Sequence, residues 1–400
     1  MSTNNSPANY PLLTLHPIAD ARERWVAILL QAESDAADSA ALFRLLAEAE
    51  LFDALGPLAC VLPLKSAAML QPELITSLPV EQVVLRLPLA QCESGAGEEL
   101  LHLRNAGFRL MAEGVPGQAK LATGVNALSI NCAADANTGD AETRSALATL
   151  PGPHLALALD DPGQLKRYQD MGFGWISGNH PLRVASVSPA TANPGRATML
   201  KLLGQIVSDA DSKDIETTLK QDPQLSYQLL KLVNSVAFAL TTEIGSFGQA
   251  ITLLGRRQLQ RWLQLLLYAR PNNEKGHASP LMPRAALRAG LMENLAKLTA
   301  CSKEVQEQAF MVGMFSLLEP MFGQSSAEVI KPLHLAQDVT SALVARQGRL
   351  GLWLSAIEAS ENGPLPPARA ALADAGVDSV IWFKAQVAAA RWAIQVSREA

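Results

Sequence analysis

The stretch VASVSPATANPGRAT, residues 184–198, divides the chain into two halves with different sequence patterns. It combines two prolines and a glycine with several small polar residues, a composition that is typical of a linker. Before it, short apolar runs alternate with helical segments. After it, almost every segment has helical spacing. We therefore expect an α/β domain at residues 1–183, a linker at 184–197 and an all-α domain at 198–400.

The N-terminal half contains eight apolar runs with strand character. They are HPIAD (16–20), WVAILL (25–30), ACVLPL (59–64), QVVLRLPL (82–89), GFRLMAEGV (107–115), NALSINC (126–132), HLALALD (154–160) and GWISG (174–178). Helix-forming segments lie between several of them, and such alternation favours a parallel sheet covered by helices. Eight strands fit a closed barrel of the TIM type, although an open doubly wound sheet has the same alternation.

Helical periodicity continues through the C-terminal half. Apolar residues between 199 and 207 fall on one stripe. Asp222-Pro223 has the composition of a helix start, with aspartate at the N-cap and proline in the first turn. Gly255 interrupts a helical pattern that resumes as RRQLQRWLQLLLYAR. We expect no strand after residue 195.

The composition excludes several classes of protein. The chain has 400 residues, of which 48% are hydrophobic and 18% charged, so it can bury a large core. Its formal net charge of -5 gives no reason to expect nucleic-acid binding. Its longest apolar runs fall short of the ~20 residues that a membrane helix needs. The N-terminus does not read as a signal peptide, and the four cysteines lie far apart. We expect a cytoplasmic protein with no membrane insertion.

Common catalytic motifs are missing from the sequence. GxxxxGK[ST], GxGxxG, GxSxG and HExxH do not occur, and no two of the six histidines lie within five residues of each other. Glu113 and Asp160 each end a predicted strand, where parallel barrels place catalytic groups. Asp161 suits the N-cap of the helix that follows it. Two carboxylates could do acid–base chemistry, but phosphodiester cleavage usually needs a richer metal-binding set.

A basic helix start is the other candidate site. Arg256, Arg257 and Arg261 lie within one and a half helical turns, next to Trp262. Such a cluster could bind phosphates or an acidic partner. It could equally be a solvated face whose arginines have ion pairs of their own.

Two stretches of the C-terminal half, QDPQLSYQLLKLVNS (221–235) and SFGQAITLLGRRQLQRWL (246–263), resemble the HDOD domain, a helical relative of the HD phosphohydrolases. The residues that carry the resemblance are Asp222, Pro223, Asn234, Ser235 and Gly255. HD enzymes hold metal ions with a consecutive His-Asp pair. In the matching stretch, AFMVGMFSLLE (309–319), Ser316 and Leu317 occupy these positions. They cannot form an HD metal site, and the HDOD family also lacks the pair.

The order of the upstream strands resembles an EAL domain, the fold of cyclic-di-GMP phosphodiesterases, over about residues 12–183. The resemblance implies metal ions held by several carboxylates and an amide. At the matching positions this sequence has other residues, namely Ile28 or Leu29 and Arg86 for two glutamates, Pro63 for an asparagine, Glu113-Gly114 for an Asp-Asp pair, Ser129 for a lysine, Asn131 for an aspartate, Asp160 for a glutamate and Ser177 for a glutamine.

These replacements lead us to expect a degenerate barrel without phosphodiesterase activity. Isoleucine, leucine and proline offer no side-chain ligand, and Arg86 would repel a divalent cation. We therefore expect neither catalytic residues nor a metal ion or other cofactor.

By resemblance, an EAL-like barrel followed by an HDOD domain implies a non-catalytic bacterial signalling protein. We expect it to bind other signalling proteins, within cyclic-di-GMP-linked control of motility, biofilm or virulence. An alternative is a receptor that binds a cyclic dinucleotide in the barrel mouth without hydrolysing it, with Arg86, Arg109 and Lys120 as the candidate cations. A third reading is a hydrolase with an unrecognised site. The sequence leaves the oligomeric state open.

Overall fold

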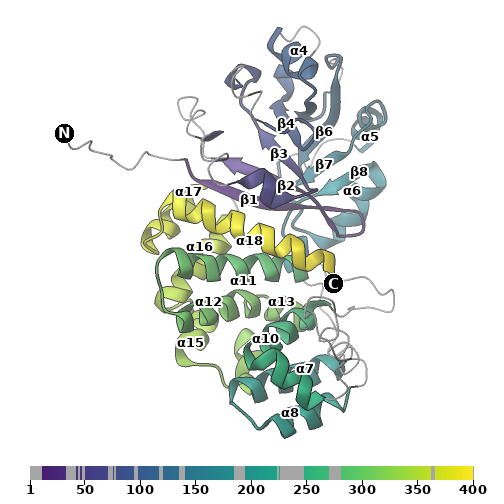
Figure 1. Cartoon of the computed structure of the whole chain (residues 1–400). Helices are drawn as coiled ribbons and strands as arrows, with labels where there is room; N and C mark the ends of the chain where they lie inside the picture. The colour runs from purple at the N-terminus through teal and green to yellow at the C-terminus, as the bar shows by residue number, and fades with distance from the viewer. Residues whose placement is uncertain are drawn as a thin grey trace, which may run out of the picture.

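The structure is a computed structural model of the chain. It describes residues 11–32, 42, 43, 46, 50–70, 75, 78–93, 98–116, 120–134, 140–183, 194–222, 225, 247–269, 281–361 and 365–399. The described part contains a barrel and a helical region that pack against each other (Figure 1).

Eight strands form a closed barrel in which each strand neighbours the next and β8 returns to β1. They are β1 (Leu13–Asp20), β2 (Trp25–Ala32), β3 (Ala59–Pro63), β4 (Val83–Pro88), β5 (Arg109–Glu113), β6 (Val125–Asn131), β7 (His154–Leu157) and β8 (Phe173–Ile176). Every predicted strand is present. The prediction of a TIM-like barrel is confirmed, and the open sheet is excluded.

The sheet is parallel from β2 to β8, as expected, whereas β1 runs antiparallel to both β2 and β8. The cause is the short link between β1 and β2. Asp20 Oδ1 accepts hydrogen bonds from the backbone N–H groups of Arg22 and Arg24, and its other oxygen pairs with the Arg24 guanidinium at 2.7 Å. This turn reverses the chain directly, and a parallel crossover needs a dozen or more residues.

Short helices surround the barrel between its strands. They are α2 (Leu51–Leu55), η2 (Ala67–Met69), η3 (Leu89–Gln91), α4 (Glu98–Asn105), α5 (Asp140–Ala148), η4 (Pro162–Gln164), α6 (Leu165–Met171) and η5 (His180–Leu182). Because successive strand residues point to opposite faces, one set of apolar side chains fills the barrel and the other packs under the helices. Asp161 caps η4 by accepting a hydrogen bond from the Gly163 N–H, as predicted.

Every element described after residue 193 is helical. The elements are α7 (Pro194–Val207), α8 (Ser212–Leu219), α10 (Phe247–Ala269), α11 (Leu281–Leu298), α12 (Lys303–Phe315), α13 (Leu318–Phe322), α14 (Ser326–Ile330), η8 (Lys331–Leu333), α15 (Gln337–Ala345), α16 (Gly348–Glu361), α17 (Leu365–Asp374) and α18 (Ser379–Glu399). None of the described helices is long and apolar enough to cross a membrane.

Three details of the helical region bear on the predicted linker and helix boundaries. Helix α7 begins at Pro194, so the last residues of the predicted linker are helical, with proline at the start where its missing N–H costs nothing. Gly255 interrupts α10 as expected, with φ 72° and ψ 158°. Asp222 Oδ1 accepts a hydrogen bond from the Leu225 N–H at 3.0 Å, as its predicted role at a helix start requires.

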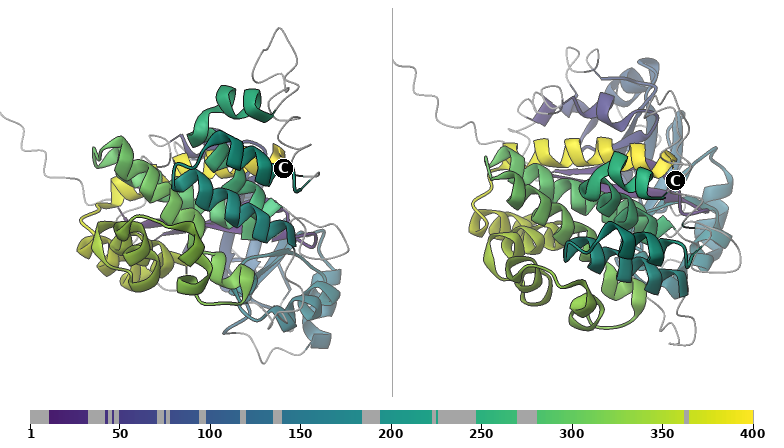
Figure 2. Two further views of the ribbon diagram at one scale, coloured as in Figure 1. Left: turned by 90° about the horizontal axis from the view of Figure 1, so that it is seen from below. Right: turned by 60° about the horizontal axis from the view of Figure 1, so that its bottom comes forward.

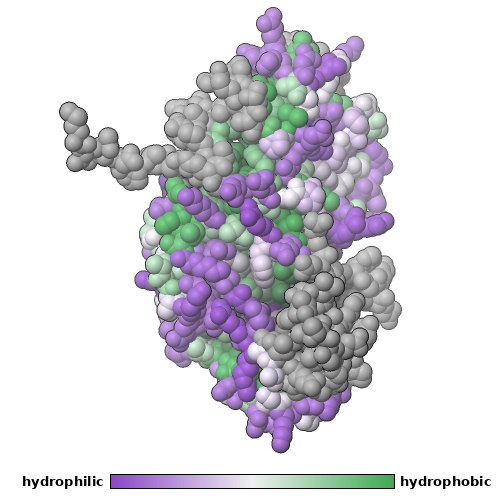
Figure 3. All heavy atoms as spheres, viewed as in Figure 1, coloured by the Kyte–Doolittle hydropathy of each residue, from purple (hydrophilic) through white to green (hydrophobic). Residues whose placement is uncertain are grey.

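Helix α18, the last in the chain, joins the helical region to the barrel. It lies between β1 and α11 (Figures 1 and 2). One of its faces contributes Phe383, Val387, Ala390 and Ile394 to the hydrophobic core of the barrel. On the face shown in Figure 3, hydrophobic residues reach the surface mainly along the barrel and at this junction, whereas the helical region is largely hydrophilic. Other residues of α18, namely Trp382, Ala385 and Ala389, belong to the core of the helical region, so this helix packs into both cores.

The same helix covers the open edge of β1. Strand β1 pairs with β8 only at Ala19 and Asp20, so the preceding residues have no strand on that side. Gln386 fills the gap, because its Oε1 accepts from the Leu15 N–H at 2.9 Å and its Nε2 donates to the Leu13 carbonyl at 2.8 Å. The Trp382 indole N–H donates to the same carbonyl at 3.0 Å. Side chains of α18 thus replace the missing strand.

Candidate functional site

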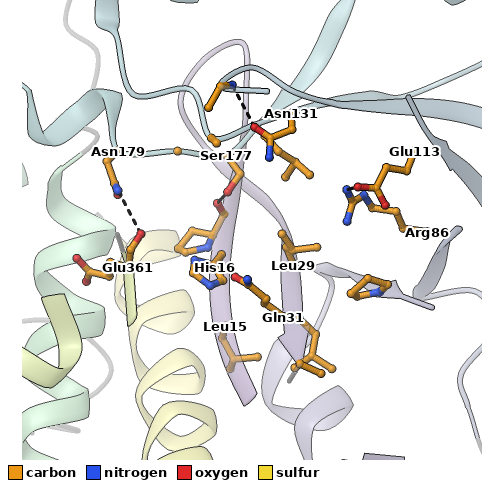
Figure 4. A pocket seen from close by; sticks show the side chains of 18 of the residues that line it. Leu15, His16, Leu29, Gln31, Arg86, Glu113, Asn131, Ser177, Asn179 and Glu361 are labelled. Atoms are coloured by element: carbon orange, nitrogen blue, oxygen red, sulfur yellow. Dashed lines mark hydrogen bonds and ion pairs between the residues drawn. The ribbon is translucent and has the colours of Figure 1, made fainter. Parts of the chain in front are cut away.

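A cavity of about 730 Å³ opens at the carboxyl ends of the parallel strands, where the barrel meets the helical region (Figure 4). Its barrel side is lined by residues at or just after the ends of β2 to β8. Since β1 runs the other way, its early residues, including His16, also line the cavity. Catalytic and binding residues of parallel barrels usually lie at this end, so the cavity is the candidate site.

The pleat of the strands explains which residues reach this cavity. On β4, Val84 points into the barrel and Arg86, two residues later, reaches the cavity. On β5, Met111 and Glu113 repeat the arrangement. Strand β2 decides between the two alternatives left by the sequence. Leu29 lines the cavity, whereas the neighbouring Ile28 packs in the layer between barrel and helices.

An arginine–glutamate pair occupies the cavity at the ends of β4 and β5. The Arg86 guanidinium lies 2.6 Å from Glu113 Oε1, and its Nε donates to Ser129 Oγ at 2.9 Å. The two side chains point toward each other in Figure 4. Burial lowers the pKa of Arg86, an effect that the charge of Glu113 partly offsets. Arg86 is 11% exposed and Glu113 is 47% exposed, so a mostly buried cation is neutralised by a more open carboxylate.

The other polar groups of the barrel mouth also have internal partners. Asn131 Oδ1 accepts from the backbone N–H groups of Ala133 and Ala134. Ser177 Oγ donates to the Pro17 carbonyl at 2.9 Å, next to the open edge of β1. Asp160 Oδ1 accepts from the Asn179 N–H at 2.9 Å. Of the remaining degenerate positions, Pro63 lines the cavity, and Gly114 continues from β5 with a φ of 112°.

The residues of this mouth do not fit the divalent metal ions that an active EAL domain would hold. Leu29 and Pro63 have no ligand atom in their side chains. Arg86 places a positive charge among the positions that match the family's ligands, and Glu113 is already bound to it. Metal ions of this class prefer several oxygen ligands. In the part of the chain that the structure describes, no three His, Cys, Asp or Glu side chains lie together in a way that could hold a metal ion.

The helical region forms the other wall of the cavity. Arg284 and Leu287 enter from α11, and Glu361 enters from the end of α16. Arg284 Nη1 donates to Asn179 Oδ1 at 2.9 Å, and its Nη2 donates to the Gly178 carbonyl. Asn179 in turn donates to the backbone carbonyl of Glu361 at 3.1 Å (Figure 4). A chain of hydrogen bonds therefore crosses from the loop after β8 to two helices.

A second arginine, Arg288, contacts the residues at the position that matches the HD metal site. Ser316 is buried, and its Oγ accepts from Arg288 Nη1 at 3.0 Å while donating to the Gly313 carbonyl. Leu317 is buried in the helical core. Arg288 binds both carboxylate oxygens of Glu361, at 2.9 and 2.5 Å. The barrel mouth and the position that matches the HD pair thus each contain an arginine bound to a glutamate and a serine.

The basic helix start does not form a converging cluster of cations. Each arginine has a carboxylate partner on a different part of the helical region, namely Asp209 for Arg256 at 3.2 Å, Glu307 for Arg257 at 2.9 Å and Glu293 for Arg261 at 2.7 Å. Trp262 packs, partly buried, against the helical core. These ion pairs favour the second alternative, a solvated helix face whose arginines are paired with carboxylates of the same protein. Of the HDOD signature, Pro223, Asn234 and Ser235 lie outside the described residues.

Only one of the three cations named for a cyclic-dinucleotide site lines the cavity. Arg86 does so, but Arg109 begins β5, at the opposite end of the barrel, where it donates to the Glu81 carbonyl at 3.4 Å. Lys120 is exposed and does not line the cavity. The cations that the sequence analysis missed are Lys65 and Arg284. A signal for Arg284 was present, since the mostly apolar segment LMPRAALRAG carries two arginines four residues apart.

Two histidines near Arg284 should make the fold sensitive to mild acid. Burial lowers the pKa of His16 and of His180 to about 4, and the charge of Arg284 contributes to both shifts. An unfolded histidine titrates near 6.5, so the unfolded chain binds more protons between about pH 6.5 and 4. The free energy of unfolding should therefore fall as the pH drops through this window, by about 1–3 kcal/mol.

Urea denaturation at pH 7 and pH 5 measures this effect. We expect the His180→Gln variant to lose less stability between the two pH values than the unaltered protein. His102, exposed on α4, provides the matched control His102→Gln. Equal pH dependence in both variants would show that His180 is not responsible.

Comparison with known proteins identifies the first part of the helical region. Residues 197–319 match the model of the HDOD domain. The cyclic di-GMP phosphodiesterase CdgJ of Vibrio cholerae is 26% identical over 245 residues, which are 61% of this chain and 56% of the relative. The uncharacterised protein YuxH of Bacillus subtilis is 32% identical over 152 residues, 38% of this chain and 36% of the relative. The chain thus spans about half or less of the length of these curated relatives.

Solved structures with EAL domains are similar to part of the chain. One is BlrP1 of Klebsiella pneumoniae in a manganese and cyclic-di-GMP complex, with a TM-score of 0.34, 16% identity and coverage of 43% of this chain and 55% of that one. Another is YkuI of Bacillus subtilis with cyclic-di-GMP and calcium, with a TM-score of 0.35, 12% identity and coverage of 53% and 71%. The protein described here carries an HDOD domain at residues 197–319, preceded by an eight-stranded barrel.

Proposed function

We propose that this protein is a non-catalytic regulator in cyclic-di-GMP-linked signalling, acting by binding rather than by turnover. The observation that carries the proposal is the Arg86 guanidinium, held between Glu113 and Ser129 at the barrel mouth. In the EAL family a metal ion activates the attacking water, and the positions that would hold it here have become apolar, cationic or internally bonded. The residues that remain favour recognition over hydrolysis.

The electrostatics of the mouth support this reading. A divalent cation would have to displace Arg86 from Glu113 and then lie beside a guanidinium in a partly buried site, where like charges repel more strongly than in water. A guanidinium can stabilise a phosphate, but it does not lower the pKa of a bound water as a metal ion does. In the helical region, the ion pair of Arg288 with Glu361 beside Ser316 would oppose a metal ion for the same reason.

The link to cyclic-di-GMP rests on relatives. The Vibrio cholerae relative is named a cyclic di-GMP phosphodiesterase. Residues 197–319 match the HDOD domain, the second domain that the sequence resemblance implied. The positions that matched EAL ligands lie together at one barrel mouth, as they would if the barrel descended from that family. Control of motility, biofilm or virulence is part of the proposal.

Binding of other signalling proteins should be tested with the full chain. Because α18 contributes to the barrel core, cutting the chain between its halves would expose apolar surface on both. The arginines of α10 are already paired with carboxylates of the helical region, which argues against a preformed binding site for an acidic partner at this helix. Capture experiments with the intact chain test whether it binds other signalling proteins.

Hydrolysis is the activity to test for the proposal. The purified chain incubated with cyclic-di-GMP and Mg²⁺ or Mn²⁺ should yield no linear dinucleotide, because no group of three His, Cys, Asp or Glu side chains among the described residues could hold the metal. Chromatography of the reaction mixture measures the product. The proposal fails if product accumulates in proportion to protein and metal.

A second candidate, a non-hydrolysing cyclic-dinucleotide receptor, is favoured by the cavity itself. Its volume of about 730 Å³ falls within the range of about 300–1,000 Å³ that is common for ligand pockets. Apolar walls and a few polar groups converge on it, and Arg284 and Lys65 add positive charge. Calorimetric titration of the full chain with cyclic-di-GMP separates this candidate from a purely protein-binding regulator.

A further inference from the structure

Arg284 is a cation that the helical region presents to the barrel cavity. It lies in the first turns of α11 and is partly buried, and it lines the cavity together with barrel residues. Its printed hydrogen bonds go to two neutral oxygens, Asn179 Oδ1 and the Gly178 carbonyl. Within the described residues, no carboxylate lies within 4.0 Å of its guanidinium. Glu361 and Asp160 act on Arg284 only from a longer distance.

Three other charged groups around the cavity have nearer partners. Arg86 pairs with Glu113 at 2.6 Å, Glu361 with Arg288 at 2.5 Å and Asp160 with Arg183 at 3.9 Å. Burial lowers the pKa of Arg284, and the charge of Arg288 acts in the same direction, whereas the charges of Glu361 and Asp160 offset the shift only in part. An anion entering the cavity would supply the missing counter-charge in a setting where solvent screening is weak.

The chemistry of the cavity selects the kind of anion. Arginine binds phosphate oxygens through paired N–H groups, and such charge-assisted hydrogen bonds are stronger than neutral ones. Leu29, Leu157 and Leu287 give the cavity apolar walls suited to the flat faces of nucleobases. Lys65, after β3, adds a second cation at the mouth. A phosphorylated nucleotide satisfies both features.

We propose that Arg284 anchors a phosphate group of a nucleotide bound in the barrel mouth, so that the ligand contacts the barrel and the helical region at once. This inference rests on the receptor candidate above and assigns its main cation to α11 instead of the barrel. Asn179 accepts from Arg284 and donates to the backbone of Glu361, and Glu361 binds Arg288. Occupancy of the cavity is thereby connected to the buried ion pair of the helical core.

Isothermal titration calorimetry of the full chain tests the inference, with cyclic-di-GMP as the probe and guanosine, which lacks phosphate, as the comparison. We expect the unaltered protein to bind cyclic-di-GMP and to show no heat with guanosine. Arg284→Gln should weaken binding at least tenfold, and Arg284→Lys, which keeps the charge, should retain part of the affinity. Arg391→Gln, which removes an exposed arginine of α18, is the matched control and should bind like the unaltered protein.

The outcomes separate this inference from the receptor candidate. Absence of binding by the unaltered protein overturns the receptor candidate and with it the role of Arg284. Equal affinities for the unaltered protein and Arg284→Gln overturn the role of Arg284 and leave the receptor candidate standing. Hydrogen exchange on the unaltered protein gives a second readout that needs no variant. Bound cyclic-di-GMP should slow amide exchange in the first turns of α11, and unchanged exchange there under saturating ligand contradicts the inference.

Discussion

Replacing Glu361 with glutamine should lower the free energy of unfolding by about 3–5 kcal/mol. Glu361 holds the buried Arg288 by two hydrogen bonds, at 2.9 and 2.5 Å, and Arg288 is only 4% exposed. Glutamine keeps the size of the side chain but leaves the guanidinium without its main counter-charge. Glu358, at 3.6 Å from Arg288, also pairs with Arg346 and compensates only in part. Urea denaturation at pH 7 measures the loss.

Two further variants show whether charge causes the effect. Asp170→Asn removes the acid of an exposed pair with Lys166 and should change stability by less than about 1 kcal/mol. Replacing both members of the buried pair, Arg288→Met with Glu361→Leu, should recover much of the loss, since a buried ion pair is often no better than apolar residues of similar volume. A Glu361→Gln variant as stable as Asp170→Asn would contradict the importance of the buried pair.

Replacing Gln386 with leucine should cost about 2–4 kcal/mol, because two backbone groups of β1 lose their hydrogen-bonding partner. The Leu15 N–H and the Leu13 carbonyl are buried beneath α18, and an unsatisfied buried group costs about 1–3 kcal/mol. Trp382 still donates to the Leu13 carbonyl and limits the loss on that side. Thermal and urea unfolding both measure the change, and we expect barrel and helices to unfold together because α18 packs into the cores of both.

The matched control is Lys384→Gln, at an exposed position of the same helix. It should leave stability within about 0.5 kcal/mol of that of the unaltered protein. If Gln386→Leu behaves like this control, the edge of β1 is satisfied in another way and α18 is not needed to complete it.

The strands could be predicted because a buried strand requires a short run of apolar residues, which is visible in the sequence. Runs such as QVVLRLPL and HLALALD are apolar, short and bounded by turn residues, and all eight runs became strands. The direction of β1 relative to its neighbours could not be predicted from these runs. It depends on the turn that Asp20 and Arg24 stabilise, which alternation of strands and helices does not reveal. The start of α7 at Pro194 could not be predicted either, because proline occurs both in linkers and at helix starts.

The barrel side of the site could also be predicted from the sequence. Glu113 and Asp160 end predicted strands, Arg86 lies within another, and closure of the barrel brings these strands to one mouth. The other wall of the cavity could not be predicted from the sequence, because Arg284 and Glu361 reach the mouth through tertiary packing. Their contacts with Asn179 span more than 100 residues of sequence. The covering of β1 by Gln386 depends on a contact over 373 residues, for which the local pattern of α18 gives no signal.

The central claim is that a guanidinium has taken the place of metal-binding groups at the barrel mouth. The initial rate of cyclic-di-GMP hydrolysis by the purified full chain, compared in Mn²⁺ and in a chelator, tests it most directly. We predict equal rates, both indistinguishable from a protein-free blank. A rate that rises with Mn²⁺, scales with protein concentration and disappears in the Glu113→Gln variant would contradict the claim.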